Sequence, residues 1–391
     1  MISPSARLAT GYLAYFAAVG VFTPFWSPYL ASRGFSALEI SWLLGAGAGV
    51  RAIGPVLVGW FADLNHPTRV LRLAVLFALV SFALLPAHAS LWGFIAFSVL
   101  FSLTWNSVIP LYDVHTLDHL GVGSARYGSI RLWGSLGFVA SSWIAGMVFQ
   151  VLGYRRFPWV LGGLVALTLM TTLYIRPMRR VSGTGARQNF AASLRSRAAW
   201  VSLLVAALIA VSFGAYYTFF SLYLERHGYS RGTIGLLWAL GVVAEIVVFA
   251  TGHTLLHRFS IRSLFVLAAS GTALRWAMVA LLVQHPLALA ASQLLHCLGF
   301  AVLHYAIVLT AQRLFPSGVQ SRGQALFSSA GYGLGGMLGN LLAGVMWVAF
   351  SPRASYVSAT FIVVLAAVAA AVGLRGTELD EAQGPDSQTD S

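Results

Sequence analysis

The sequence predicts an all-α integral membrane protein of about twelve transmembrane helices, arranged in two similar halves. Of its 391 residues, 58% are hydrophobic and only 9% are charged. Soluble domains carry about a quarter charged residues, so a water-soluble fold of this composition would lack a polar surface. Hydrophobic runs of membrane-spanning length and an internal repeat support the same prediction.

Each hydrophobic run is close to the ~20 residues that a helix needs to cross the hydrocarbon core of a bilayer. The twelve runs lie near residues 8–30, 38–62, 71–87, 90–114, 127–150, 157–175, 200–224, 232–256, 263–284, 287–312, 323–349 and 355–374. Membrane-spanning β-strands would be half as long and would alternate in polarity. The first run is too long for a signal peptide and no cleavage pattern follows it, so it is predicted as the first span.

An internal repeat divides the chain into halves. A shift of 194 positions gives ten ungapped identities in 28 positions, placing span one on span seven and span two on span eight. The identities are Gly20, Phe25, Ser27, Tyr29, Leu30, Gly34, Ser36, Ile40, Leu43 and Gly47 with Gly214, Phe219, Ser221, Tyr223, Leu224, Gly228, Ser230, Ile234, Leu237 and Gly241. Both spans keep their orientation, so the halves are parallel, as in the major facilitator fold.

The predicted domain organisation follows from this repeat. We expect an N-terminal six-helix bundle over 1–176 and a C-terminal six-helix bundle over 200–375. The polar, arginine-rich segment 177–199 is expected to be a cytoplasmic linker, and the polar, acidic segment 376–391 to be a disordered tail.

Charge distribution predicts the orientation. The net charge is +13 and all 24 basic residues are arginine; because they lie mostly at span ends, we expect a lipid bilayer and no nucleic acid as partner. Three arginines fall inside spans and fifteen on the side of the N-terminus. The opposite side has six: Arg33, Arg155, Arg156, Arg226, Arg231 and Arg353. The positive-inside rule therefore predicts that both termini lie in the cytoplasm. We expect a monomer in a bacterial inner membrane.

Charged side chains inside spans cost roughly 2.5–3.5 kcal/mol each, so each one needs a reason. Asp113 in span four and Arg131 in span five each lie within about two turns of the cytoplasmic helix end, at similar depth. They are interpreted either as a substrate-binding charge pair or as a structural ion pair that joins the two helices. Asp113 is also a candidate for proton coupling.

Glu245 in span eight and Arg275 in span nine repeat this pattern near the middle of the membrane. A carboxyl there can bind a proton on one side and release it on the other if its surroundings change. The pair is therefore a candidate for proton coupling, with a static ion pair as the alternative.

Two histidines in span ten, His296 and His304, are further candidates for proton coupling, although a single histidine on such a helix is more often a hydrogen-bonded core residue. In a regular helix they would be about 80° apart. This spacing is poor for metal ligands, and the single cysteine, Cys297, excludes an internal disulfide and a cysteine-based metal site. No metal and no cofactor are expected, with a proton as the coupling ion.

Arg51 in span two leaves three arginines against two acids inside the spans, which weakly favours an anionic substrate; the alternative is an arginine paired with backbone carbonyls or snorkelling. Span one and span seven are rich in aromatic residues, most of them expected to serve packing or interface anchoring. The candidate substrate-binding residues are Arg131, Arg275, Arg51, Trp133, Tyr216 and Asn106.

Several segments resemble the 3-phenylpropionate permease family of the major facilitator superfamily, which is close to the lactose permease group. They are Gly11–Gly34, Tyr127–Val139, Leu237–Ala250, Leu274–Met278 and Gln293–His304. The resemblance extends over most of the chain and is less specific for substrate than for family. It implies twelve helices, alternating access and proton symport.

In the lactose permease group, acids on helices four and eight, arginines on five and nine, and a histidine on ten form the substrate and proton sites. The resemblance assigns these places to Asp113, Arg131, Glu245 and Arg275, with His296 or His304. Two departures matter. No acid follows either histidine by one turn, and the basic pattern between spans two and three is reduced to Gly59, Asp63, Arg69 and Arg72.

The first functional hypothesis is a proton-coupled importer of a small aromatic carboxylate such as 3-phenylpropionate. The second is a proton symporter of a neutral sugar or nucleoside. The third belongs to another class, a membrane sensor or scaffold with the transporter fold. An enzyme is not expected, because no catalytic constellation is present, and the glycine-rich span eleven does not form a nucleotide-binding loop.

Overall fold

The computed structural model describes residues 3–85, 90–120, 126–175, 193–316 and 320–381, and every regular element in these ranges is helical. Ten of the described helices are long and apolar enough to cross a membrane. An eleventh is obtained if the bent pair Ala37–Arg51 and Val56–Ala62 counts as one span. The predicted span near 71–87 corresponds to α4 (Pro67–Leu84). The predicted all-α membrane fold is therefore confirmed.

The chain divides into two compact units. Unit 1 comprises Met1–Ser182 with Tyr217–Val242, and unit 2 comprises Gly183–Tyr216 with Val243–Ser391. Residues 217–242 thus pack with unit 1, although the repeat assigns them to the second half of the sequence. Most of the predicted linker lies outside the described residues. The division into two six-helix bundles stays a prediction.

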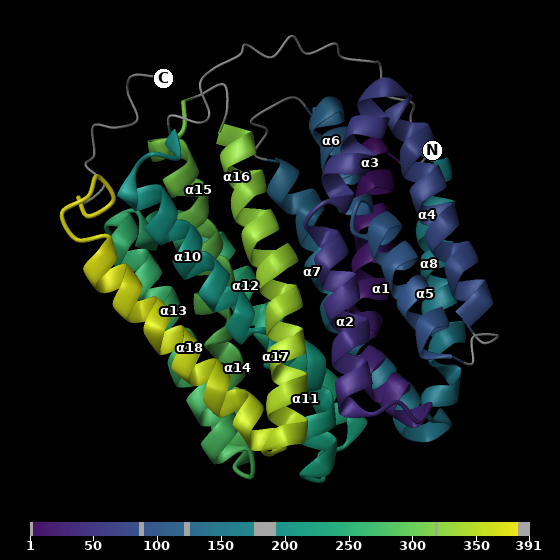
Figure 1. The fold of residues 1–391 in the computed structure, drawn as a ribbon. Coiled ribbons are helices and arrows are strands. Elements are labelled where there is room, and N and C mark those ends of the chain that lie inside the picture. The colour runs from purple at the N-terminus through teal and green to yellow at the C-terminus, as the bar shows by residue number, and fades with distance from the viewer. Residues whose placement is uncertain (1–2, 86–89, 121–125, 176–192, 317–319, 382–391) are drawn as a thin grey trace. The chain divides into compact units, whose positions relative to one another are not determined.

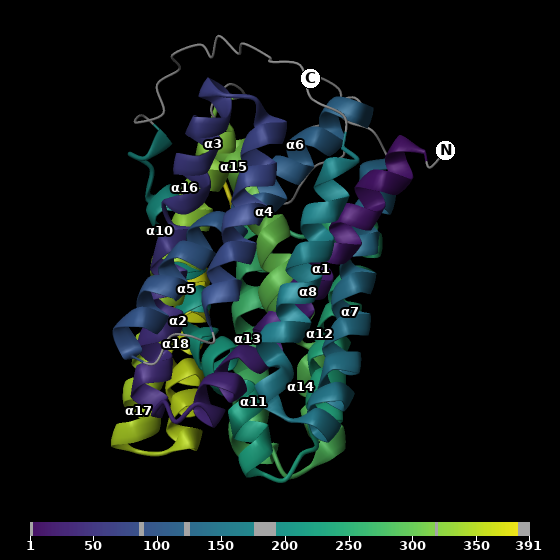
Figure 2. The same cartoon turned by 90° about the vertical axis from the view of Figure 1, so that its right-hand side faces the viewer.

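Unit 1 is built around α1, which lies beside both α7 and α8 (Figure 2). Its elements are α1 (Pro4–Ser32), α2 (Ala37–Arg51), α3 (Gly54–Leu64), α4, α5 (Leu91–Trp105), α6 (Val108–Leu120), α7 (Arg126–Leu152), η2 (Tyr154–Arg156) and α8 (Phe157–Leu173), with most of α11 (Gly214–Arg226) and the first part of α12 (Arg231–Leu256).

In unit 2, α18 packs along α13 and α10 (Figure 1). The elements of this unit are α10 (Arg197–Ser212), the end of α12, α13 (Ile261–Leu282), α14 (Pro286–Leu294), η3 (Leu298–Val302), α15 (Leu303–Leu314), α16 (Gln320–Ser328), η4 (Ser329–Gly335), α17 (Gly336–Ala349) and α18 (Pro352–Gly373). The elements η3 and η4 are π-helical segments, which commonly occur at functional sites.

Prolines account for two breaks within spans of unit 1. Proline lacks the N–H that would bond to the carbonyl four residues earlier, and its ring clashes with that carbonyl. Pro55 in the first turn of α3 therefore ends α2 at Arg51, and Pro110 in α6 ends α5 near Asn106. The two halves of the second span are bent by 42°.

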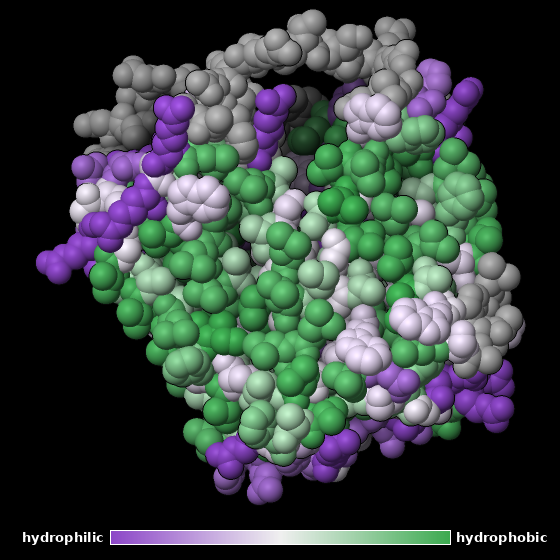
Figure 3. Space-filling view, in the orientation of Figure 1, coloured by the Kyte–Doolittle hydropathy of each residue, from purple (hydrophilic) through white to green (hydrophobic). Residues whose placement is uncertain are grey.

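Large hydrophobic side chains are exposed along the helices of both units, which fits a hydrocarbon solvent. Trp92, Val151 and Leu287 are 76%, 82% and 88% exposed. On the face shown in Figure 3, hydrophobic residues cover the middle of the helices and hydrophilic residues gather at their ends.

In each unit, arginine side chains donate hydrogen bonds to the last backbone carbonyls of one helix. Arg72 donates to the carbonyls of Thr172, Leu173 and Ile175 at the end of α8, and Arg7 donates to Tyr174 there. The last carbonyls of a helix lack the regular N–H donor four residues later, and a cation is favoured at this end of the helix dipole.

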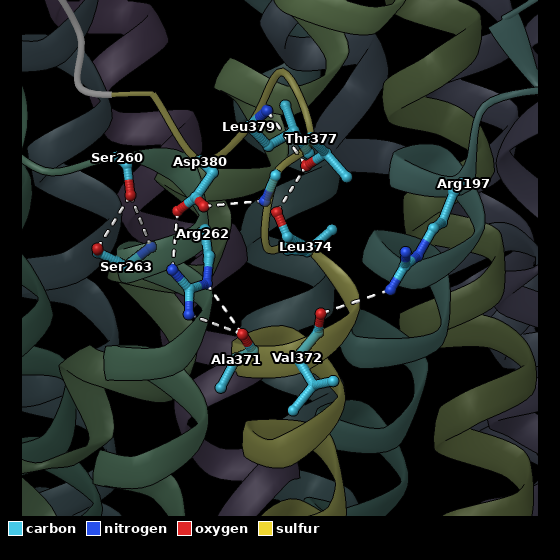
Figure 4. Close-up of polar contacts among 11 residues, drawn as sticks. Arg197, Ser260, Arg262, Ser263, Ala371, Val372, Leu374, Thr377, Leu379 and Asp380 are labelled. Carbon is cyan, nitrogen blue, oxygen red and sulfur yellow. Dashed lines mark hydrogen bonds and ion pairs between the residues drawn. The ribbon is translucent and has the colours of Figure 1, made fainter.

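Unit 2 repeats this arrangement at the end of α18. Arg262 donates from Nε and Nη2 to the carbonyl of Ala371, and Arg197 donates to the carbonyl of Val372 at 3.5 Å (Figure 4). Arg197 and Arg262 follow Arg7 and Arg72 by the same interval in the sequence. This interval is 190 residues, four fewer than the shift of the repeat, so the two helix ends have equivalent contacts although the arginines do not align at 194 positions.

The segment after α18 folds back onto this arginine. Asp380 Oδ1 lies 2.8 Å from Nη1 of Arg262, its Oδ2 accepts from the backbone N–H of Gly376, and the N–H of Arg262 donates to the carbonyl of Leu379 (Figure 4). Leu379 is fully buried. The prediction of a disordered tail from residue 376 is therefore wrong for 376–381, because a buried leucine and an ion pair hold these residues; 382–391 lie outside the described residues.

We predict that Asp380→Asn lowers the melting temperature, and that this loss depends on pH. The N–H of Gly376 and the guanidinium of Arg262 hold the pKa of Asp380 below its ordinary value. The carboxylate therefore adds stability above the unfolded-state pKa of about 3.9, and this contribution is lost as the pH falls through the lower folded-state pKa. Melting of purified protein between pH 7 and pH 3 measures the difference.

The matched control is Glu378→Gln, which removes the same charge from an exposed position of the same segment. It should leave the melting temperature close to that of the wild type at every pH. If Asp380→Asn has no larger effect than this control at pH 7, the ion pair with Arg262 does not stabilise the fold.

Candidate functional site

The first cluster of buried or half-buried charges lies in unit 1, where α1 and α7 pack closely. Glycines on α7 permit this approach: a Cβ at Gly137 would overlap the carbonyl of Leu13, and one at Gly134 would overlap the ring of Phe16. Gly134 is one turn from Arg131, so the ring of Phe16 lies against the same face of α7. We call Tyr12, Phe16, Asp113, Tyr127 and Arg131 the Arg131 cluster.

Asp113 on α6 is held by two phenol groups. Its Oδ1 accepts from the hydroxyls of Tyr12, at 2.5 Å, and Tyr127, at 2.9 Å. The distance from the same oxygen to Nε of Arg131 is 4.0 Å, the outer limit of an ion pair. The predicted pair of Asp113 and Arg131 is thus brought together, but the hydrogen bonds of the carboxylate come from tyrosines.

Arg131 lies over aromatic rings. Its Cζ is 4.6 Å from the centre of the Phe16 ring and 5.4 Å from that of Tyr12, within the range of a cation–π contact. Its side chain is 37% exposed. A guanidinium fixed on two rings, with its edge accessible and only a distant carboxylate, is suited to binding a carboxylate in a bidentate manner.

The second cluster lies in unit 2, and again a small residue permits the approach. A Cβ at Gly271 on α13 would overlap Leu298, and one at Gly299 in η3 would overlap the hydroxyl of Thr272. This places Arg275, one turn after Gly271, beside the segment that precedes η3. We call Tyr216, Glu245, Arg275, Gln293 and His296 the Arg275 cluster.

Arg275 is completely buried. It donates from Nη1 to Nδ1 of His296 at 2.6 Å and from Nη2 to Oε1 of Gln293 at 3.0 Å. Its Cζ lies 4.1 Å from the ring centre of Tyr216 and 4.4 Å from that of Trp276. Rings and hydrogen-bond partners therefore surround this guanidinium.

In the described residues, His296 lies between Glu245 and Arg275 and contacts both. The distance from Nε2 of His296 to Oε1 of Glu245 is 2.7 Å. Because a guanidinium can only donate, Nδ1 of His296 must accept, and the proton of a neutral imidazole must then sit on Nε2 and point at Glu245. The cluster is a chain in which Arg275 donates to His296 and His296 donates to Glu245.

This chain limits where an added proton can go. Protonation of His296 would place N–H groups on both ring nitrogens, and Nδ1 could no longer accept from Arg275. Protonation of Glu245 requires no such change, since its other oxygen can carry the proton while Oε1 still accepts from Nε2. An added proton on Glu245 would therefore leave both hydrogen bonds of His296 in place, whereas an added proton on His296 would not.

His304 does not join the Arg275 cluster; its ring centre lies 6.2 Å from that of Phe249 on α12. Phe249 is one turn after Glu245, so both histidines face α12 at different depths. The estimate of 80° between them is wrong, because η3 lies between them and a π-turn contains one residue more than an α-turn. With that residue counted, the separation falls to roughly 20°.

Three other candidates lie outside both clusters. Arg51 is exposed at the last residue of α2, where a cation is favoured by the helix dipole. Asn106 ends α5 and donates to the carbonyl of Ser102. Trp133 on α7 is 48% exposed. Their predicted role in substrate binding stays a prediction.

Sequence reasoning missed Tyr12 and Tyr127 as partners of Asp113, and gave Gln293 no role. Tyr12 and Phe16 are four residues apart on α1, as are Tyr127 and Arg131 on α7. Residues at this spacing share one helix face. This spacing could have indicated that Tyr12 and Tyr127 belong to the Arg131 cluster. Similarly, Gln293 lies one turn before His296.

Comparison with known sequences gives matches over most of the chain. A model of the MFS_1 like family matches residues 5–358. A probable 3-phenylpropionic acid transporter of Escherichia coli (strain K12) is 33% identical over 316 residues, which cover 78% of this chain and 82% of that protein. A maltose permease of Geobacillus stearothermophilus is 30% identical over 347 residues, which cover 86% of each chain.

Among solved structures, the nucleoside transporter NupG has a TM-score of 0.83 at 14% identity, covering 96% of this chain and all of the other. A bacterial homologue of the human lysosomal transporter Spinster, in an inward-facing and occupied conformation, has a TM-score of 0.75 at 16% identity, covering 96% and 98%. At these identities the likeness establishes the fold.

Proposed function

Since the chain belongs to the MFS_1 like family and is a multi-pass membrane transporter, we propose that it imports a small aromatic carboxylate together with protons. The relevant relatives are secondary transporters of small molecules. The substrate class and the coupling ion are the parts that we propose. We place the protein in the bacterial inner membrane with both termini in the cytoplasm.

The observation that carries the substrate class is the position of Arg131. Its guanidinium is partly exposed and stacks on Phe16 and Tyr12. A substrate that combines a carboxylate with an aromatic ring would meet the N–H donors of Arg131 beside the half-buried ring of Phe16, whereas Tyr12 is completely buried and supports the guanidinium from below. The name of the E. coli relative, a probable 3-phenylpropionic acid transporter, points to the same class.

The Arg275 cluster supports proton coupling. Glu245 is buried and is the one member of the chain Glu245–His296–Arg275 that can gain a proton without breaking the chain. A carboxylate in this position that is charged in one conformation and neutral in another couples proton movement to the conformational cycle. Import of an organic anion with protons needs a group of this kind.

A neutral sugar or nucleoside is the second candidate for the substrate. Relatives named as a maltose permease and a putative nucleoside transporter favour it. In that case the carboxylate of Asp113 and the half-buried hydroxyl of Tyr127 would contribute to substrate binding. The two candidates differ in whether Arg131 must meet a negative charge.

The test is uptake into proteoliposomes that are monitored with an external pH-sensitive dye. Adding 3-phenylpropionate should make the external medium more alkaline, whereas maltose and nucleosides should not. Alkalinisation with maltose or a nucleoside alone would replace the proposed substrate with the second candidate. Uptake of 3-phenylpropionate without alkalinisation would refute proton coupling, and absence of transport with every class would refute the proposal.

A further inference from the structure

Gln293 is a completely buried amide whose position is fixed on both sides. Its Nε2 donates to Oγ of Ser292 at 2.9 Å, and Ser292 in turn donates to the carbonyl of Leu289. Its Oε1 then faces Arg275 and accepts from Nη2. A buried amide whose oxygen and nitrogen both have partners is costly to displace.

Gln293 and His296 hold Arg275 together. They are three residues apart and lie on one face of the helix, and they accept from the two terminal nitrogens of the same guanidinium. Two acceptors fix the plane of a guanidinium, whereas a single acceptor leaves it free to rotate. The second anchor therefore determines whether Nη1 stays on Nδ1 of His296.

The position of Nη1 has a chemical consequence for His296. While Nη1 donates to Nδ1, that nitrogen cannot carry a proton, so Glu245 takes up any added proton. If Arg275 rotates away, Nδ1 can be protonated, and the resulting imidazolium would pair with a charged Glu245. In the described residues, the titratable or charged side chains that face His296 from the packed elements are Glu245 from α12, Arg275 from α13 and Tyr216 from α11.

We propose that Gln293 is a positioning residue that holds Arg275 against Nδ1 of His296 and thereby keeps the proton on Nε2, so that Glu245 is the proton-binding group. The statement that Glu245 is the proton-binding group rests on the proposed function. The tautomer of His296 does not depend on it and can be measured independently.

The decisive variant is Gln293→Leu, which removes the acceptor. In full-length protein labelled with 15N-histidine and reconstituted in nanodiscs, the spectrum of His296 is identified by its loss in His296→Gln. In the wild type, Nδ1 should show the shift of an unprotonated ring nitrogen. In Gln293→Leu it should move toward that of a protonated nitrogen. Gln293→Glu keeps an oxygen acceptor and should restore the wild-type position.

Transport gives the second readout. The pH profile of uphill uptake should shift in Gln293→Leu, whereas Gln293→Glu adds a titratable carboxyl to the cluster and is therefore compared by the tautomer of His296 alone. Exchange of substrate across the membrane should continue in both. If Gln293→Leu does not fold, Gln293→Met, which keeps the length of the side chain and offers only a weak acceptor, replaces it in the same measurements.

An unchanged shift of Nδ1 in both apolar variants would overturn the proposal. The proposal would also be overturned if the tautomer of His296 changed in Gln293→Glu, because loss of the acceptor could then not explain the change in Gln293→Leu. If the tautomer responds as expected but no variant and no wild-type protein moves protons, the positioning role stands and the proposed proton coupling fails.

Discussion

Replacing Glu245 with glutamine should abolish accumulation of substrate against its gradient while substrate exchange continues. Glutamine cannot bind a proton, but its oxygen can still accept from Nε2 of His296, so the contacts of the Arg275 cluster stay in place. The accumulation ratio in proteoliposomes with an imposed proton gradient should fall to about one, the value for a carrier that is not driven. Counterflow of labelled substrate measures exchange.

The matched control is Asp113→Asn, the corresponding change in the Arg131 cluster. It weakens a contact near the proposed substrate and should raise KM, but it should leave uphill accumulation measurable at high substrate concentration. If Glu245→Gln still accumulates substrate, or if Asp113→Asn abolishes accumulation and Glu245→Gln does not, then the proton is bound elsewhere than at Glu245.

Replacing Arg131 with glutamine should weaken binding of an aromatic carboxylate by about 10–150-fold. This range corresponds to the ~1.5–3 kcal/mol that a hydrogen bond to a charged group contributes. The reason is geometric: Arg131 offers an accessible fork of donors, whereas Arg275 is enclosed by rings and by its own acceptors. Titration calorimetry with 3-phenylpropionate measures the dissociation constant.

The amide of the same acid provides an internal control, since it keeps the ring and loses the charge. Its affinity should differ little between the wild type and Arg131→Gln. Arg131→Lys should fall between the two proteins, because lysine keeps the charge but cannot present a planar fork. An equal loss for acid and amide would show that Arg131 supports the fold of the site and does not recognise a negative charge.

Much of the candidate site was predictable because charges inside hydrophobic spans are rare and stand out in a sequence. Asp113 with Arg131, and Glu245 with Arg275, were identified in this way, and the structure places the members of each pair in one cluster. The repeat predicts two parallel halves, and the contacts of Arg7 and Arg72 with one helix end, and of Arg197 and Arg262 with another, follow the same pattern in both. These inferences need only the position of a residue along a span.

The partners of these charges were not predictable in the same way. The hydroxyl of Tyr12 reaches Asp113 because of how α1 and α6 are rotated about their own axes, which hydrophobic spans do not specify. The insertion of His296 between Glu245 and Arg275 likewise depends on the approach that Gly271 and Gly299 permit. The breaks between α2 and α3 and between α5 and α6 could have been predicted from the sequence, because Pro55 and Pro110 interrupt helical hydrogen bonding within hydrophobic spans.

The π-helical segment η3 also bears on how residues are to be matched between relatives. A related chain with a regular helix in this place would align to Leu298–Val302 only across a one-residue gap. If the gap is omitted, every position after 302 is assigned to a helix face rotated by about 100° from its true one. Functional positions after Val302 in this helix should therefore be assigned by superposition of coordinates, since a residue count across η3 gives the wrong neighbour.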